Sequence, residues 1–524
     1  MTDQERLAIS AYLVGDDDVS ARAWEAAHRA ALRAGDPQGA ARCAFWLAMG
    51  LLMRGHPAQA GGWLTRVERL IEETGADCPA AGLLLIPALL TSLGAGDPVT
   101  ARDLAVRAGA LGDRFGDPDL RALGTLGHGQ ALIAMGELRA GVARLDEVML
   151  SVTRDEVWPV TTGIVYCAVI LECMQLYDLQ RAAEWTGALS SWCDAQPDLV
   201  PYRGQSLVHR SQLQQSSGAW SDAISSAEAA SQRLARPPHP ALGLAYYQLA
   251  DLHRLVGELD RAEAEYRQAS RHGQNPMPGL ALLQRARRAD DRAVAGIRRA
   301  LLEARDSLQR PALLYAAVDI YLAVGDLLDA RSAADELTSI AAASSSHVLG
   351  AMAAYAKGAV LVTEGDPEPA LAELRSAATG WQALNVPYEA ARTAAWRGKA
   401  CLDLGDVTTA AVELGNAKDT FAQLGAAADL ERVEAQLNRV EGKVAATATG
   451  EAALLLSDRE RQVLAQVAAG KTNREVAQAL AISQHTVGRH LENIFTKLGV
   501  TTRAAAIAAA YEHRLLGAPE PPAR

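Results

Sequence analysis

The chain carries a repeated turn signal at intervals close to 40 residues along most of its length. Successive intervals are 40, 41, 40, 41, 41, 39, 33, 35, 40 and 40 residues. The turn positions are Gly15, Gly55, Gly96, Gly136, Tyr177, Gly218, Gly257, Asp290, Gly325, Gly365 and Gly405. A helix pair of this length cannot bury its apolar face alone and must stack on its neighbours. The spacing therefore predicts an all-α solenoid over residues 1–440.

Small residues follow most of these turns at a fixed distance of five residues. They are Ala60, Ala101, Gly141, Ala182, Ala223, Ala262, Ala295, Ala330, Ala370 and Ala410. A small side chain lets two helices approach closely, so we expect these positions to lie at the crossing within each helix pair.

The unit around Gly257 resembles a tetratricopeptide repeat. The resemblance rests on Tyr246, Leu249, Ala250, Ala262, Tyr266 and Ala269, with Gly358 and Gly398 at the equivalent small site of later units. The usual period of that repeat is about 34 residues, which only the intervals of 33 and 35 approach, so a HEAT-like repeat is the alternative. Both imply a concave surface that binds a protein or small-molecule effector, although helical repeats also serve as spacers.

A different pattern near the C-terminus predicts three short helices. Ser457 or Asp458 is suited to cap the first helix and Gly470 to end it, and Thr472 or Asn473 is suited to cap the second. Their apolar faces are formed by Val463, Leu464, Val467, Val476, Ala477 and Leu480.

The third helix is expected to begin after Ser483 and to have one apolar and one polar face. Its apolar positions follow the 3.6-residue period: Val487, Leu491, Ile494, Phe495 and Leu498. Its outward positions are Gln484, His485, Gly488, Arg489, Glu492 and Thr496. A tight turn between two short helices, the second with a polar face, is the geometry that places a recognition helix in the DNA major groove.

These residues resemble the DNA-binding domain of LuxR-type transcription regulators over roughly residues 452–517. The matching segments are Leu-Ser-Asp-Arg-Glu from Leu456, Thr-Asn-Arg-Glu-Val-Ala from Thr472 and Ile-Ser-Gln-His-Thr-Val-Gly-Arg-His from Ile482. The resemblance implies a four-helix domain that binds double-stranded DNA, with a helix-turn-helix motif at about 473–492. It also implies a fourth helix, about Thr502 to Leu516, that commonly forms the contact of a homodimer on DNA. The DNA-binding residues implied are Thr472, Asn473, Ser483, Gln484, His485, Thr486, Gly488, Arg489, Glu492 and Lys497.

Two positions depart from the family pattern. The family usually has Lys after Thr-Val and often Lys or Arg four residues later, where this chain has Gly488 and Glu492. Both changes weaken attraction to phosphate. Arg489 can still pair bidentately with guanine and Glu492 can accept from a cytosine amino group, whereas the plainer interpretation of both is a solvated helix face. We expect His490 to point into the domain and to be structural.

Charge separates the two parts of the chain. The net charge is −11 in total, whereas residues 456–517 hold eight Lys/Arg and five Asp/Glu, and residues 1–455 therefore carry −14. An acidic body is repelled by DNA, so DNA contact is expected only in the C-terminal domain at 455–517. The small and polar segment 441–454 is predicted to be a linker, and the Pro-rich segment 518–524 a disordered tail.

Several classes of function lack sequence support. Gly470-Lys471-Thr472 lacks the earlier glycine and the strand of a phosphate-binding loop. The acidic run Asp16-Asp17-Asp18 is interpreted as a helix-capping turn rather than a phosphoacceptor site. Residues 1–455 match no nucleotide-hydrolase domain of the kind that some large regulators with this C-terminal domain carry. We expect no catalytic residues, no cofactor and no metal site, hence no enzyme.

Cysteine use and hydropathy indicate a cytoplasmic protein without a membrane segment. The six cysteines form no Cys-x-x-Cys pair and are expected to be buried free thiols, as suits a reducing compartment. No signal segment is evident, and the longest apolar runs are too short for a bilayer. The sequence thus favours a sequence-specific DNA-binding transcription regulator with a helical-repeat sensing or protein-interaction region. The alternative is an interaction scaffold whose helix-turn-helix module has little DNA affinity.

Overall fold

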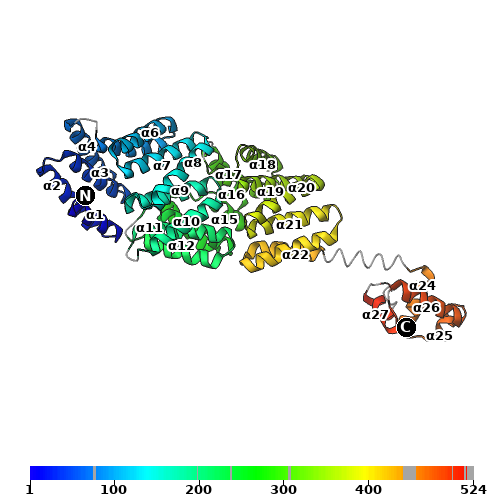
Figure 1. Cartoon of the computed structure of the whole chain (residues 1–524). Helices are drawn as coiled ribbons and strands as arrows, with labels where there is room; N and C mark the ends of the chain where they lie inside the picture. Colours follow the sequence, from blue (N-terminus) through cyan, green and yellow to red (C-terminus); the bar gives the residue numbers. More distant parts are fainter. Residues whose placement is uncertain are drawn as a thin grey trace. The chain divides into compact units, whose positions relative to one another are not determined.

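The computed structural model describes residues 1–74, 78–196, 199–236, 239–304, 308–440, 456–498, 500–512 and 515, and every regular element in these ranges is a helix (Figure 1). The first helices are α1 Asp3–Leu13, α2 Asp17–Arg33, α3 Pro37–Met53, α4 Pro57–Thr74, α5 Pro79–Gly94, α6 Pro98–Phe115, α7 Pro118–Ala134, α8 Leu138–Thr153, α9 Pro159–Gln175, α10 Leu179–Asp194, α11 Pro201–Ser216 and α12 Trp220–Leu234. They are followed by α13 Leu242–Leu255, α14 Leu259–Arg271, α15 Gly279–Ala286, α16 Asp290–Glu303, α17 Arg310–Val324, α18 Leu327–Ala342, α19 His347–Glu364, α20 Pro367–Ala383, α21 Pro387–Asp403 and α22 Val407–Leu424, and residues 427–440 are also helical. The C-terminal helices are α24 Asp458–Ala468, α25 Asn473–Ala479, α26 Gln484–Leu498 and α27 Arg503–Glu512.

Contact density divides the chain into two units, residues 1–396 with 419–430 and residues 397–418 with 431–524. The domain boundaries expected from the sequence stay predictions. The expected linker 441–454 and the expected tail 518–524 lie outside the described residues.

The turns inside the helix pairs have the left-handed backbone that the glycine spacing predicts. Ten of the eleven predicted turn residues have φ between 57° and 92°, a conformation in which glycine is strongly favoured. The prediction of Asp290 was wrong, because Asp290 is the first residue of α16 and Arg288, with φ of 59°, forms the turn. The small residue five positions later is accordingly Ala293, which is fully buried, whereas Ala295 is exposed. This turn contains no glycine, and the regular spacing by itself placed the turn two residues too late.

The small residues lie where helices cross. Ala60, Ala101, Ala182, Ala223, Ala262, Ala330, Ala370 and Ala410 are fully buried. A Cβ atom at Gly358 would lie 2.6 Å from Leu374 Cγ, and one at Gly398 would lie 2.7 Å from Leu414 Cγ. These distances are too short for a side chain, so both glycines are required for the close approach within their helix pairs.

Two glycines of α6 provide a test of this close packing. A Cβ at Gly112 would lie 2.5 Å from the backbone nitrogen of Arg121 in α7, whereas a Cβ at Gly109 would meet no atom within 4 Å. We expect Gly112→Ala to lower the free energy of unfolding by about 1–3 kcal/mol, because backbone must move to relieve the clash. Gly109→Ala should instead raise it by about 0.5–1 kcal/mol through helix propensity. Urea denaturation of both variants measures the difference, and equal effects would contradict it.

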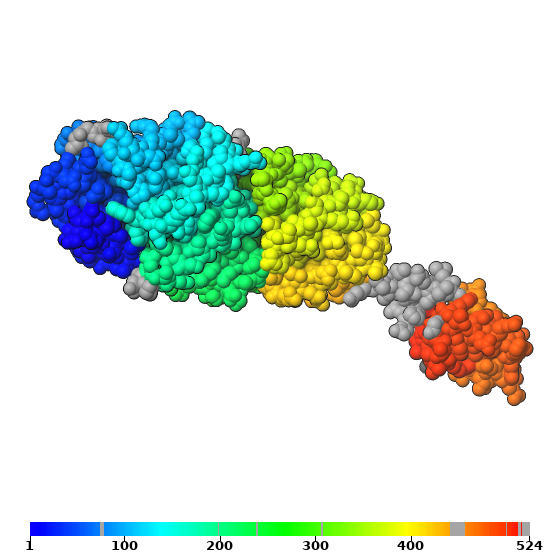
Figure 2. All heavy atoms as spheres, in the orientation of Figure 1, coloured from blue at the N-terminus to red at the C-terminus, as the bar shows by residue number. Residues whose placement is uncertain are grey.

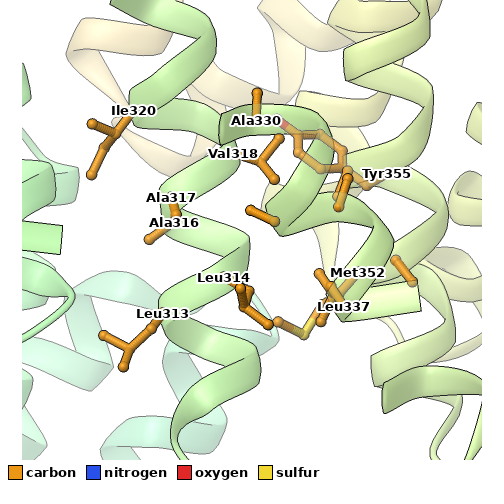
Figure 3. Close-up of a cluster of buried hydrophobic side chains, with 14 of the residues drawn as sticks. Leu313, Leu314, Ala316, Ala317, Val318, Ile320, Ala330, Leu337, Met352 and Tyr355 are labelled. Carbon is orange, nitrogen blue, oxygen red and sulfur yellow. The ribbon is translucent and has the colours of Figure 1, made fainter. Parts of the chain in front are cut away.

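Buried apolar clusters run between neighbouring helix pairs. One cluster joins α17, α18 and α19, where Leu314, Leu337 and Met352 converge (Figure 3). Along residues 1–396 the space-filling view shows successive pairs abutting in chain order (Figure 2). Several tryptophans pack in the same way, since Trp220 and Trp381 are buried and Trp63 and Trp185 lie half-buried against the clusters.

Helix pairs far apart in sequence also contact one another within the first unit. The backbone nitrogen of Val200 donates to Leu13 O at 2.8 Å, and Ser346 Oγ donates to Tyr177 O at 3.1 Å. The ring of Tyr388 packs edge-on against Trp220, with centroids 5.3 Å apart. Helix pairs that lie far apart in the sequence are therefore joined by direct contacts in the first unit.

A buried network of charges and tyrosines joins α17, α19 and α21. Arg392 Nη1 donates to Glu389 Oε2 at 2.8 Å, Arg392 Nη2 donates to Tyr355 OH at 2.8 Å, and Arg392 also pairs with Asp319. Tyr315 OH donates to the same Glu389 oxygen at 2.5 Å. The side chains of Arg392, Asp319 and Glu389 are only 13 %, 15 % and 18 % exposed. Such a network is stable only while every charge keeps its partner.

The cysteines are free and buried, as expected. Burial raises the pKa of Cys43 and of Cys173 to about 12, so both are thiols rather than nucleophilic thiolates at neutral pH. In the described ranges, no helix combines the length and the apolar character needed to cross a membrane.

Candidate DNA-binding site

The first helix of the C-terminal domain begins at a reciprocal cap. Ser457 is the N-cap of α24, and Glu460 N donates to its Oγ at 3.3 Å while Ser457 N donates to Glu460 Oε2 at 2.7 Å. This capping box satisfies two backbone N–H groups that the helix itself leaves unpaired. Gly470, with φ of 82°, follows the end of the helix as predicted.

The second helix also begins at a capping box. Thr472 is the N-cap of α25, and Thr472 N donates to Glu475 Oε2 at 2.7 Å. The turn after α25 passes through Ala481, whose φ of 53° is left-handed. This turn brings the chain to Ser483, whose Oγ accepts from Thr486 N at 3.1 Å at the start of α26.

The third helix, α26, has the two faces that the sequence predicts. Val487, Leu491 and Ile494 are buried in a core formed with α24, α25 and α27. Gln484, His485, Arg489, Glu492 and Thr496 are exposed, whereas Gly488 and His490 are half-buried. A Cβ at Gly488 would meet no atom within 4 Å. The exposed face is thus polar, with open space in its middle.

Three basic side chains hold the helices of the domain together. Arg459 Nη2 donates to Leu480 O at 2.6 Å at the end of α25. Arg503 Nη1 donates to Asn473 Oδ1 at 2.8 Å. Lys497 Nζ donates to Glu460 Oε2 at 2.7 Å. These cations contribute to the fold of the domain, and the sequence interpretation missed the roles of Arg459 and Arg503.

Apart from the half-buried Gly488, the predicted DNA-binding residues fall into two groups. Gln484, His485, Arg489 and Glu492 share the exposed face of α26, and among the described residues the structure gives Arg489 no ion pair. Asn473 and Lys497 have side chains bound within the domain, and Thr472, Ser483 and Thr486 serve in helix caps. The role of all ten residues in binding DNA stays a prediction. The paired spacing of Ser457 with Glu460 and of Thr472 with Glu475 is the sequence signal that could have identified the caps.

The pair of Lys497 and Glu460 should stabilise the domain in a pH-dependent way. Burial opposes ionisation of Glu460, but the hydrogen bonds from Lys497 and Ser457 outweigh it and lower the pKa of this carboxyl. A lowered carboxyl pKa contributes stability above the unfolded value of about 4.3 and loses it as the pH falls through the folded value.

Lys497→Met should therefore destabilise the domain by about 1 kcal/mol at pH 7, a value reduced by the partial exposure of the lysine, and by less at pH 3. Hydrogen exchange of α24 in the full chain measures the change. Arg474→Met is the matched control, because Arg474 is exposed and has no ion pair in the described part of the domain. Equal loss of protection at both pH values would contradict the role of Glu460.

Residues 454–510 match the family described as bacterial regulatory proteins, luxR family. The C-terminal domain is a LuxR-type helix-turn-helix domain. A DNA-binding domain of this family implies transcription regulation, and this confirms the resemblance seen in the sequence.

Two regulatory proteins resemble the chain in this LuxR-type domain. The probable transcriptional regulatory protein SgaR of Hyphomicrobium methylovorum is 49 % identical over 53 residues, which are 10 % of this chain and 25 % of SgaR. The probable transcriptional regulatory protein NarL of Mycobacterium tuberculosis is 44 % identical over 62 residues, which are 12 % of this chain and 29 % of NarL. The chain thus spans only a quarter to three tenths of the length of these relatives.

Two solved helical structures align with larger parts of the chain. The structure of the APC/C hetero-tetramer Cut9–Hcn1 aligns with 84 % of this chain and 90 % of its own, at 14 % identity and a TM-score of 0.39. A Rap protein complexed with competence and sporulation factor aligns with 70 % of this chain and 99 % of its own, at 12 % identity and a TM-score of 0.35.

Proposed function

We propose that the protein is a sequence-specific DNA-binding transcription regulator of the cytoplasm that reads the major groove with α26. The observation that carries this proposal is the exposed polar face of α26, with Arg489 free of ion pairs in the described part of the domain, above the buried residues Val487 and Leu491. Arginine in that position on a recognition helix is suited to bind the O6 and N7 atoms of guanine.

The second part of the proposal concerns the assembly on DNA. A homodimer would present two α26 helices to two half-sites one helical turn apart. The exposed α27 residue Tyr511, 64 % accessible, is available for a contact between copies. The helical-repeat region would receive the signal, from a protein or a small molecule, and change how the two domains are presented.

Selection of bound duplexes from a random DNA library by the full-length protein tests this function. Sequencing at moderate salt should show enrichment of a defined site with approximate two-fold symmetry. The same selection with residues 450–524 separates two kinds of failure. Enrichment by this fragment alone would indicate that the repeat region inhibits DNA binding, whereas no enrichment by either protein would contradict the proposal.

A second candidate function is an interaction scaffold whose helix-turn-helix domain binds DNA weakly. It is favoured by the exposed Glu492 and by Gly488, where the family usually has lysine. The space beside Gly488 is open, so Gly488→Lys should fold normally and, in a regulator, should strengthen binding and steepen its salt dependence by about one phosphate contact. If the protein is a scaffold, neither the variant nor the natural chain will shift the migration of duplex DNA in a mobility-shift titration.

A further inference from the structure

A cavity of about 340 Å³ lies in the N-terminal part of the repeat region. It is enclosed by α1, α2 and α3 on one side and by α9, α11 and residues 239–241 on the other. Voids larger than a water molecule are few in protein interiors, whereas ligand pockets measure about 300–1,000 Å³. The cavity therefore has the size of a small-molecule site and not of a packing defect.

The two walls of the cavity are fastened to each other. Val200 N donates to Leu13 O at 2.8 Å beside the cavity, and the rings of Tyr12 and Tyr202 lie edge to face with centroids 6.4 Å apart. These contacts join the two walls beside a partly open space that the surrounding side chains do not fill.

The lining of the cavity is mainly apolar and aromatic. Its apolar residues include Ile9, Trp24, Trp46, Met49, Ile164 and Leu171. Tryptophan faces attract both flat apolar rings and cations, and methionine adapts its shape to varied ligands. This surface suits a molecule with a ring system.

The polar end of the cavity is formed by the acidic turn before α2. Asp17 lines the cavity, and no hydrogen bond or ion pair to its carboxylate is present within the described ranges. Burial raises the pKa of Asp17 against the opposing effect of Arg54. Arg54 itself is engaged, with Nη1 3.7 Å from Asp18 Oδ1 and Nε donating to Gly50 O at 3.4 Å.

The other polar groups of the lining add no free positive charge. Burial lowers the pKa of His239, so its ring is neutral at pH 7, and its Nδ1 accepts from Ala241 N at 3.1 Å. Gln205 Oε1 accepts from Cys167 Sγ at 3.2 Å and leaves the amide hydrogens of Gln205 for a ligand. A partly desolvated carboxylate without a partner is stabilised by a cation and destabilised by a second anion.

We propose that this cavity binds a small molecule that combines an apolar ring system with one protonated amine. The ring lies between Trp24 and Trp46, and the ammonium group pairs with Asp17. This site goes beyond DNA binding, because occupancy of the cavity can be measured without DNA and its failure leaves the proposed function of the C-terminal domain untouched.

Three probes of one shape and different charge test the site by calorimetry on the full-length protein at pH 7. They are 1-naphthylmethylamine, 1-naphthylmethanol and 1-naphthoic acid. The amine should bind about tenfold more tightly than the alcohol, and the acid should bind most weakly. Asp17→Asn should reduce the preference for the amine over the alcohol to about one while the alcohol still binds; Asp16, the N-cap of α2, is retained in this variant. Equal or tighter binding of the alcohol or the acid, or no binding of any probe, would overturn the proposal.

A substitution that fills the cavity with a large side chain tests whether the probes bind there. Gly50 of α3 lines the cavity and has open space where a Cβ would lie, so Gly50→Phe should fold and abolish amine binding. Gly62 of α4 also has open space but does not line the cavity, so Gly62→Phe is the matched control and should bind normally. Circular dichroism checks that both variants are helical. Undiminished binding by a folded Gly50→Phe, or equal loss in Gly62→Phe, would place the probe elsewhere and refute the site.

Discussion

Replacement of Arg392 by methionine should lower the free energy of unfolding of the helical-repeat region by about 3–5 kcal/mol. The guanidinium is the only cation bound by both Asp319 and Glu389 in the described network, and it also donates to Tyr355 OH. Methionine has a similar length but cannot neutralise two buried carboxylates, so their mutual repulsion and desolvation remain. Urea denaturation monitored by circular dichroism measures the loss.

The pH dependence of this loss distinguishes charge from packing. Burial raises the pKa of Glu389 even with Arg392 present, and removal of the cation should raise it further. A raised folded pKa favours the protonated carboxyl, so the variant should regain stability relative to the natural chain as the pH falls from 8 to 5 and lose it again as the pH rises through the folded value. A loss that is independent of pH would mean that the guanidinium acts through packing alone.

Two further variants serve as controls for Arg392. Arg144→Ala removes an ion pair with Glu147 in which both side chains are about half exposed, at 46 % and 55 %, and should cost less than about 1 kcal/mol. Addition of Asp319→Asn to Arg392→Met should recover part of the lost stability, because one unpaired charge is removed. If the double variant is less stable to urea than Arg392→Met alone, the proposed role of charge in the network is wrong.

Local patterns predicted most of the helices and turns because these depend on residues close in sequence. The turn spacing located ten of the eleven turns, nine of them at glycine and one at Tyr177, because a left-handed turn favours glycine in any tertiary context. The exception at Arg288 shows the limit, because a left-handed backbone at arginine leaves no signal in the sequence. The faces of α26 were predictable for the same local reason.

Contacts between distant helix pairs were not predictable from the sequence. Ser346 binds the backbone of Tyr177 across 169 positions, and no periodicity relates two such residues. The acidic run at Asp16 was correctly interpreted as a helix cap, since Asp16 Oδ1 accepts from Val19 N at 3.0 Å. Its neighbour Asp17 lines the cavity together with residues of α9 and α11, which lie far from it in the sequence, so no local pattern could predict this site.

Arg489→Ala should remove the sequence preference of DNA binding at the base pair that this arginine contacts. A bidentate contact between arginine and guanine contributes about 1–3 kcal/mol of discrimination, and the loss should appear at one base pair of each half-site. Alanine is compatible with the helix and leaves the buried residues Val487 and Leu491 untouched, so the domain should remain folded. When the library selection is repeated with the variant, the selected sites should show no base preference at that base pair and unchanged preferences at the other positions.

Two other substitutions separate base recognition from electrostatic attraction. Arg474 is exposed on α25, the helix before the proposed recognition helix, and we expect it to contact the DNA backbone. Arg474→Ala should therefore weaken binding to all duplexes alike and lower the slope of log affinity against log salt by about one. Glu492→Lys should raise binding to every sequence and make it more sensitive to salt, because it replaces a repelled charge by an attracted one. If Arg489→Ala instead behaves like Arg474→Ala, with selectivity retained and only affinity reduced, Arg489 contacts phosphate, and the bases are read by other side chains on the exposed face of α26.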